Sequence, residues 1–206
     1  MHIDIASQIA AVDRRVENRE HEGRPARVVV ATRTYAAPVD DVWDAVTNPD
    51  RIPRWFLPVS GDLRLGGRYQ LEGNASGTIT GCEPPRHLAL TWEFGGEVTW
   101  VEVRLEEDPG GTRLQLEHAA HDDERWGEFG PGAVGVGWDM ALLGLDQHLA
   151  TGAAVEGASA WMESAEGKAF MRGSSDEWGR AAVASGTPED AALAAAARTS
   201  AAYAGD

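Results

Sequence analysis

The residue in this sequence best suited to proton chemistry is His118. It ends the run from Leu114 to His118, in which apolar and polar side chains alternate. The period of a β-strand therefore places His118 on the same side as Leu114 and Leu116. A neutral imidazole in such apolar surroundings could accept or donate a proton, and a pKa lowered by burial would make it a usable base. An inward histidine more often only satisfies a core hydrogen bond, so catalysis and a structural role both stay open.

Aromatic side chains form the second group of candidate site residues. The chain has eight tryptophans, a high number for 206 residues. Ligand cavities are lined mainly by apolar and aromatic groups with few polar ones, and the same side chains can also simply fill a core. The expected ligand-binding residues are Trp55, Phe56, Tyr69, Trp92, Leu116, His118, Trp126, Phe129, Trp138, Ala141 and Leu145.

Other kinds of site have weaker support. Glu117, His118, His121 and the acidic residues 122–124 lie close in sequence, but alternation turns Glu117 and His118 to opposite sides of a strand. No fixed ligand spacing is present, so we expect a solvated acidic loop and no metal. A nucleophile elbow, a phosphate-binding loop, a dinucleotide glycine fingerprint and a zinc-protease motif are all missing, and no cofactor is expected.

The charge balance narrows the class of partner. The chain has 33 acidic and 18 basic side chains, a formal net charge of -15, which repels nucleic acid and anionic lipid surfaces. Its start lacks the pattern of a secretory signal, and no run approaches the ~18 apolar residues of a membrane span. The lone Cys82 cannot form an intrachain disulfide and fits a reducing compartment. A cytoplasmic protein without a nucleic-acid or membrane partner is expected.

The first elements that must position these residues are helices and one strand. Ile5, Ile9, Val12 and Val16 recur at steps of three and four, which predicts a short helix before the first strand. The segment 27–35 is rich in Val and Thr and is typical of a strand. Pro38 suits the start of a helix, and Asn48-Pro49 predicts a second short helix that runs through Trp55.

From Val59 to His118 the sequence is typical of an antiparallel meander, with short alternating runs separated by Gly, Pro, Asn or Asp pairs. One face of that sheet is apolar and needs a cover. The segment 131–150 predicts a helix of about five turns that supplies it, in which glycines would allow a close approach of the backbone to the sheet or to a ligand. Further helices are expected from Ala158 and from Thr187-Pro188, with Thr187 as the capping residue.

These elements divide the chain into three expected parts. Residues 1–26 form an N-terminal helical arm, residues 27–151 a central α+β domain, and residues 152–206 a C-terminal helical extension. The extension is expected to act either as a lid on the domain or as the contact surface of a homodimer, and the sequence leaves this choice open.

Several motifs resemble the SRPBCC (START-like) superfamily, in the branch related to the activator of the heat-shock-ninety chaperone ATPase. They are Arg33-Thr34-Tyr35-Ala36-Ala37-Pro38-Val39-Asp40-Asp41-Val42-Trp43-Asp44-Ala45, Asn48-Pro49-Asp50-Arg51-Ile52-Pro53-Arg54-Trp55-Phe56, Asp62-Leu63-Arg64-Leu65-Gly66-Gly67-Arg68-Tyr69, Pro84-Pro85-Arg86-His87-Leu88 and Gly137-Trp138. The resemblance implies a helix-grip fold, in which a curved antiparallel sheet wraps around a long helix.

The resemblance also implies a cavity between the sheet and the long helix, without naming its ligand. The first expectation is therefore a binding protein for a small hydrophobic or amphipathic molecule. The alternatives are a cyclase-like or dehydratase-like enzyme that uses the same cavity, and an interaction protein that acts on a chaperone or regulator. The separate docking domain that precedes this module in the eukaryotic co-chaperone is not seen in this sequence.

Overall fold

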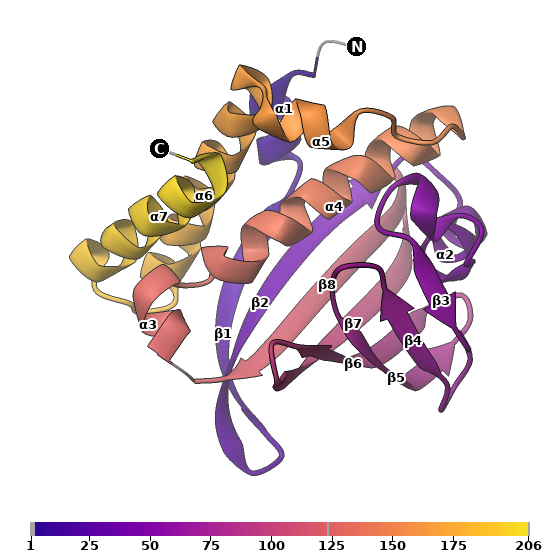
Figure 1. Cartoon of the computed structure of the whole chain (residues 1–206), viewed down its shortest axis with the longest axis horizontal. Coiled ribbons are helices and arrows are strands. Elements are labelled where there is room, and N and C mark those ends of the chain that lie inside the picture. Colours follow the sequence, from indigo (N-terminus) through magenta and orange to yellow (C-terminus); the bar gives the residue numbers. More distant parts are fainter. Residues whose placement is uncertain (1–2, 123, 206) are drawn as a thin grey trace. The chain divides into compact units, whose positions relative to one another are not determined.

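The computed structural model describes residues 3–122 and 124–205, and these form an α+β fold. An antiparallel sheet has the strand order β1-β2-β8-β7-β6-β5-β4-β3 (Figure 1). The strands are β1 (Asp13–His21), β2 (Arg24–Tyr35), β3 (Val59–Gly61), β4 (Arg68–Leu71), β5 (Ser76–Glu83), β6 (His87–Phe94), β7 (Glu97–Asp108) and β8 (Gly111–His121). The six strands β3 to β8 confirm the predicted meander.

Helices precede and follow this meander along the chain. They are α1 (Ile5–Ala10), α2 (Val39–Thr47), the 3-10 turn η1 (Ile52–Arg54), α3 (Glu124–Phe129), α4 (Gly132–Thr151), α5 (Ala158–Glu163), α6 (Ala165–Ala184) and α7 (Glu189–Ala204). The long helix α4 confirms the helix predicted over 131–150. Within the described part of the chain, none of the helices is both long and apolar enough to cross a membrane.

The chain forms two compact units. The first comprises Met1–Ala31, His121–Leu143 and Glu156–Asp206, and the second comprises Thr32–Ala120 and Gly144–Val155. Strand β2 and helix α4 each contribute residues to both units. The boundaries at 26 and 151 that the sequence suggests stay a prediction.

In the second unit, the last two turns of α4 are held by polar contacts. Asp146 of α4 pairs with the buried Arg33 of β2 at 2.8 Å. The Nε–H of Arg51 donates to Nε2 of His148 at 3.2 Å, so the proton of this imidazole lies on Nδ1, 2.7 Å from the Ala153 carbonyl oxygen. These contacts fix the end of α4 against β2 and against the segment that follows α2.

A glycine lets α4 approach η1 closely in this same unit. A Cβ atom at Gly144 would lie 2.5 Å from the carbonyl oxygen of Trp55, much closer than such atoms can pack. The α4 backbone is therefore closely packed at Gly144, but its partner is backbone of the segment after η1 and not the sheet or a ligand, as the sequence led us to expect.

The first unit corrects two predictions about helix ends. Helix α1 stops at Ala10, and Val12 and Val16 belong to the approach to β1 and to β1 itself, so the N-terminal arm is only partly helical. A step of four residues fits one face of a strand as well as one face of a helix. For this reason the spacing of Val12 and Val16 wrongly predicted that the helix continues to Val16. Glu22 and Gly23 both have positive φ and close the β1–β2 hairpin.

The second correction concerns α7. Its N-cap is Pro188, without a side-chain cap bond, and not Thr187. The Thr187 amide instead donates to the Ala182 carbonyl oxygen at 3.1 Å, because Thr187 takes part in the turn that ends α6.

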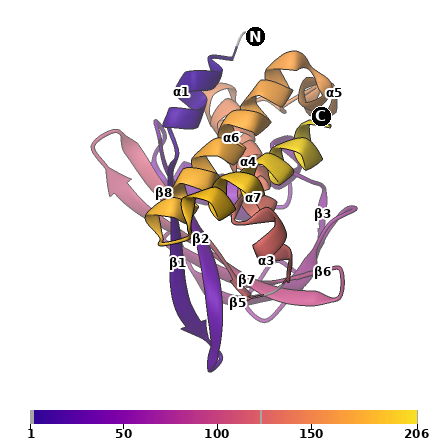
Figure 2. The same cartoon turned by 90° about the vertical axis from the view of Figure 1, so that its left-hand side faces the viewer.

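The C-terminal helices pack within the first unit. Helices α6 and α7 lie side by side, and α6 also contacts β1 and α1 while α7 contacts α3 (Figure 2). Trp178 of α6 is fully buried against Gly135 of α4, where a Cβ atom would lie 2.3 Å from the indole ring. Phe170, Met171 and Trp178 are thus core residues of this unit.

Candidate functional site

Strand register brings the best candidate residues of the second unit onto one face of the sheet. Leu90, Val101 and His118 are direct cross-strand partners on β6, β7 and β8, and Leu88, Val103 and Leu116 form the next row. Cys82 and Ile79 of β5 continue these two rows, opposite Leu88 and Leu90. We call this surface the His118 face.

Burial is uneven across the His118 face. Its side chains on β7 and β8 are buried, whereas Leu88, Leu90 and Trp92 of β6 and Cys82 of β5 are only half-buried. Phe94 continues the β6 row to the hairpin tip and is 55% exposed. The apolar surface that solvent still reaches on this face is therefore concentrated on β6 and its β5 neighbour.

His118 has a fixed hydrogen bond in this apolar setting. The imidazole is 5% exposed, and its Nε2 lies 2.7 Å from the Thr99 hydroxyl oxygen. That hydroxyl is also 3.1 Å from the Trp92 carbonyl oxygen, which can only accept, so Thr99 donates there and accepts from Nε2–H of His118. Burial lowers the pKa of His118 to about 4, and the side chain is a neutral imidazole at pH 7.

One aromatic ring lies beside this imidazole, and two more follow η1. The Trp92 ring centroid is 6.0 Å from that of His118, with the planes tilted by 56°. Trp55 stacks on Phe56 with centroids 5.5 Å apart, and its Nε1–H donates to the Ala45 carbonyl oxygen at 2.9 Å. Phe56 and Trp92 both pack against the small core cluster of Tyr69, Leu71 and Ile79.

Tyr69 brings a polar group, its hydroxyl, into this core cluster, and that hydroxyl is hydrogen-bonded. Its hydroxyl donates to the Thr91 carbonyl oxygen at 2.8 Å, and burial raises the pKa of the phenol. A Cβ atom at Gly77, the cross-strand partner of Tyr69, would lie 2.9 Å from the tyrosine ring. The glycine therefore makes room for the ring, and Tyr69 is a core residue whose hydroxyl is engaged within the sheet.

The structure distributes the eleven predicted ligand-binding residues over both units. The second unit holds Trp55, Phe56, Tyr69, Trp92, Leu116, His118 and Leu145, and the first holds Trp126, Phe129, Trp138 and Ala141. Leu145 is fully buried, and Trp126 lies under the guanidinium of Arg27 at 5.9 Å. Their common role in binding a ligand stays a prediction.

Sequence reasoning missed Thr99, which decides the tautomer of His118. The signal was present in the strand alternation, because Thr99 shares a face with Val101 and Val103. It became visible only with the register that pairs Thr99 with Trp92. Cys82, too, was missed as a candidate site residue, whereas the register places it on the His118 face.

Charged groups near the sheet are paired at the surface. Arg64 contacts Asp62 at 2.7 Å and Arg68 contacts Glu93 at 2.8 Å, and all of these side chains are accessible to solvent. Among the residues that the structure describes, no three His, Cys, Asp or Glu side chains gather in a way that could hold a metal ion. Asp123 of the acidic loop lies outside these described residues.

Known proteins that resemble the chain agree with this architecture. The family model "Activator of Hsp90 ATPase homolog 1-like protein" matches residues 36–150. The crystal structure of CalU16 from Micromonospora echinospora is 38% identical with a TM-score of 0.68, and the match covers 83% of this chain and 98% of CalU16. The solution NMR structure of CalU16 aligns over 95% of this chain and 94% of CalU16, at 34% identity and a TM-score of 0.66.

A third similar structure is DynU16, described as a protein in the dynemicin biosynthetic locus. It is 26% identical with a TM-score of 0.52, over 62% of this chain and 48% of DynU16. Among curated proteins, none matches the chain significantly. Because the family model covers more than half of the chain and CalU16 is similar over most of it, the chain belongs to the Activator of Hsp90 ATPase homolog 1-like family, a branch of the SRPBCC superfamily with the helix-grip fold.

Proposed function

We propose that the chain binds a small, uncharged apolar or amphipathic molecule on the His118 face. The observation that carries this proposal is the half-buried state of Leu88, Leu90 and Trp92 beside a buried, neutral imidazole. Apolar surface of this kind gains about 25 cal/mol for each Å2 that a ligand removes from water. A molecule that covers about 200 Å2 would gain about 5 kcal/mol before the costs of association.

The chemistry of the His118 face favours a neutral ligand. From Leu88 to Trp92 on β6, this face and its cross-strand partners on β7 and β8 are apolar except for Thr99 and His118, and the two share one hydrogen bond. A charged group placed there would lose its hydration without an opposite charge to replace it. The similarity to DynU16 supports a ligand from secondary metabolism, since that protein comes from a biosynthetic locus.

Native mass spectrometry of the full chain purified from its host tests this proposal. We expect a stoichiometric, neutral apolar adduct. The extracted molecule, added back, should shift the methyl NMR signals of Leu88 and Leu90, and 2-naphthol serves as a probe of the same surface.

A matched pair of tryptophans provides the control. Trp92 lies on the His118 face, whereas Trp100 pairs with Thr91 and Ala119 and lies on the opposite face. Trp92→Phe should weaken binding and Trp100→Phe should leave it unchanged. An adduct-free protein whose Leu88 and Leu90 methyls also ignore 2-naphthol would refute the proposal.

His118 supports an enzyme of the cyclase or dehydratase kind as the second candidate. With Nε2–H donated to Thr99, the basic lone pair of the imidazole lies on Nδ1. A base with a pKa of about 4 is weak at pH 7, because general bases work best when their pKa is close to the working pH. This is why binding ranks first. If the bound molecule is a substrate, His118→Gln should abolish its conversion while binding persists.

A further inference from the structure

The part of the His118 face that solvent reaches is long and narrow. It follows every second residue of β6 from Leu88 to Phe94, six residue steps that span about 20 Å at the rise of a strand. Near its middle, the cross-strand partners of Leu90 are Val101 on one side and Ile79 on the other, and these are only 3% and 5% exposed. At Leu90 the accessible strip is therefore about one strand wide, which suits an extended chain better than a broad ring system.

Solvent exposure rises along this strip toward the β6–β7 hairpin. On β7, Val101 is buried, Thr99 is half-buried and Glu97 is exposed. Glu97 is the direct partner of Phe94, which is 55% exposed, so the last row of the His118 face lies in solvent. A molecule on this strip thus has an inner end among aliphatic side chains and an outer end in water at the hairpin.

The hairpin turn decides which side chains stand at that outer end. Gly95 and Gly96 both have positive φ, 62° and 84°, as a two-residue hairpin turn of this hand requires. The turn sets the register in which Phe94 pairs with Glu97, and direct partners project from the same face of a sheet. An aromatic ring and a carboxylate therefore lie side by side where the strip ends.

The charge at this end disfavours an anion. Glu97 carries a negative charge on the His118 face, whereas the neighbouring Glu93, on the opposite face, is balanced by Arg68 at 2.8 Å. The segments 88–94 and 97–103 contain neither Lys nor Arg. An anionic end group would be repelled by Glu97 without meeting a cation on these strands, while a hydroxyl or amide could donate a hydrogen bond to the carboxylate.

We infer that the ligand of the His118 face is an extended, neutral amphiphile that lies along β6. Its hydrocarbon end reaches Leu88 and Leu90, and its uncharged polar end, a hydroxyl or an amide, lies beside Phe94 and Glu97. Phe94 packs on the part of the chain next to the polar end. The inference rests on the proposed function, since it uses the same surface, and it adds a direction of binding and the exclusion of fatty acids and other anionic chains.

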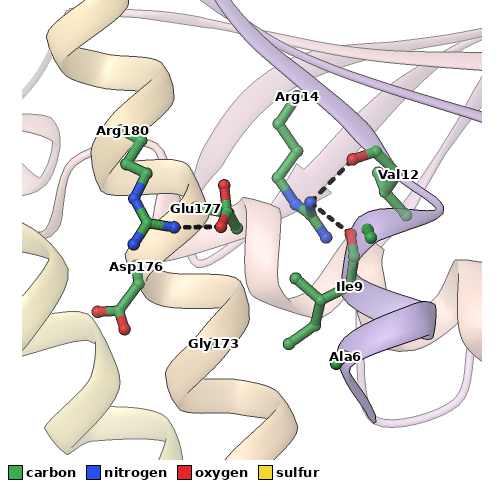
Figure 3. A pocket seen from close by; sticks show the side chains of 9 residues that line it. Ala6, Ile9, Val12, Arg14, Gly173, Asp176, Glu177 and Arg180 are labelled. Atoms are coloured by element: carbon green, nitrogen blue, oxygen red, sulfur yellow. Dashed lines mark hydrogen bonds and ion pairs between the residues drawn. The ribbon is translucent and has the colours of Figure 1, made fainter. Parts of the chain in front are cut away.

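A pocket of about 490 Å3 in the first unit, between α1, β1 and α6, is the competing site for such a molecule (Figure 3). Its wall includes four charged side chains, Arg14, Asp176, Glu177 and Arg180, and Figure 3 shows Arg180 paired with Glu177. Covering charged groups with a hydrocarbon chain costs hydration, so we expect the chain to choose the apolar strip. The amide signal of Gly173, which lines this pocket, reports on the alternative.

1-Octanol and octanoate test the inference, because they have equal chain lengths and differ in charge at pH 7. Each is titrated into the full chain while methyl and amide NMR signals are followed. We expect 1-octanol to shift the methyls of Leu88 and Leu90 and the amides of Gly95 and Gly96, and octanoate to bind at least about fourfold more weakly. Intermolecular NOEs should connect the terminal methyl of octanol with Leu88 and Leu90, and the CH2 beside its hydroxyl with the Phe94 ring.

Two glutamates of β7 form a matched pair for the charge. Glu106 is exposed like Glu97 but lies on the opposite face of the strand. Two like charges about 5 Å apart in water at low salt change a dissociation constant about fourfold. Glu97→Gln should therefore tighten octanoate binding by about this factor and leave octanol within twofold, since Gln still accepts a hydrogen bond. Glu106→Gln should change neither.

Two apolar residues of the hairpin form a matched pair for the contact. Phe94 and Val98 are 55% and 49% exposed, and Val98 pairs with Glu93 on the face opposite to Phe94. Phe94→Ala should weaken 1-octanol at least about fourfold, the value of one buried methylene, and Val98→Ala should not. Both positions are exposed, so neither variant removes a core contact.

Four results would overturn the inference. They are octanoate binding as tightly as octanol, an octanoate affinity that Glu97→Gln fails to raise, NOEs that place the hydroxyl end at Leu88, and equal octanol affinities in Phe94→Ala and Val98→Ala. A shift of Gly173 without any at Leu88 would move the probe to the pocket of Figure 3 and also count against it. If 2-naphthol still shifts the Leu88 and Leu90 methyls, the proposed function survives such a result, whereas silence toward both probes refutes the two together.

Discussion

Replacing His118 by Gln should remove most of one pH-dependent component of stability. Folding lowers the pKa of this imidazole from 6.5 to about 4 because the ring is desolvated. Between these two values the unfolded chain binds the proton that the folded protein rejects. The free energy of unfolding therefore falls as the pH drops below 6.5, and the loss is complete below about pH 4.

The size of this effect follows from the two pKa values. The linkage relation gives a loss of about 2 kcal/mol at pH 5 and about 3 kcal/mol at pH 4, and almost none at pH 7. Gln keeps an amide that can hydrogen-bond to Thr99 but does not titrate. The difference in unfolding free energy between protein and variant should therefore shrink by these amounts as the pH is lowered, while contributions from all other groups cancel.

Urea unfolding at pH 7, 6 and 5 measures this difference, and the Cε1–H NMR signal of His118 reports its protonation directly. We expect the signal to stay at its neutral position down to about pH 5. Parallel stability curves for protein and variant, together with a His118 signal that titrates near 6.5, would refute both the burial argument and the neutral imidazole on which the proposed function relies.

Further predictions concern packing and single hydrogen bonds. Gly144→Ala should destabilise the fold by about 1–3 kcal/mol, because its Cβ atom meets the Trp55 carbonyl oxygen at 2.5 Å. In Gly137→Ala, on the same helix, the new Cβ atom would meet only the Tyr203 hydroxyl, at 3.5 Å, so this variant should stabilise the fold by up to about 1 kcal/mol. Equal urea midpoints for the two variants would contradict this pair of predictions. Thr99→Val should cost about 1–3 kcal/mol and change the 15N shifts of the His118 ring, and unchanged shifts would exclude the assigned tautomer. Tyr69→Phe should cost about 1 kcal/mol in thermal unfolding through the lost bond to Thr91, and a neutral result would show that water replaces it.

The sequence alone determined the order and type of most elements. The meander from β3 to β8, the long α4 and the C-terminal helices follow from alternation, turn residues and helical periodicity, which are local properties of the chain. The inward side of Leu114, Leu116 and His118 was also predictable, because side chains alternate along any strand. The family followed from contiguous motifs between Arg33 and Trp138.

Only the tertiary structure decided how distant segments meet. Val12 and Val16 fit either period, and the Glu22–Gly23 hairpin with β2 placed Val16 in a strand and Val12 directly before it. The tautomer of His118 depends on Thr99, nineteen positions away, through a strand register that no local pattern encodes. The buried ion pair of Arg14 and Asp139 joins residues 125 positions apart, because burial and hydrogen bonding are properties of the packed molecule rather than of the sequence near each residue.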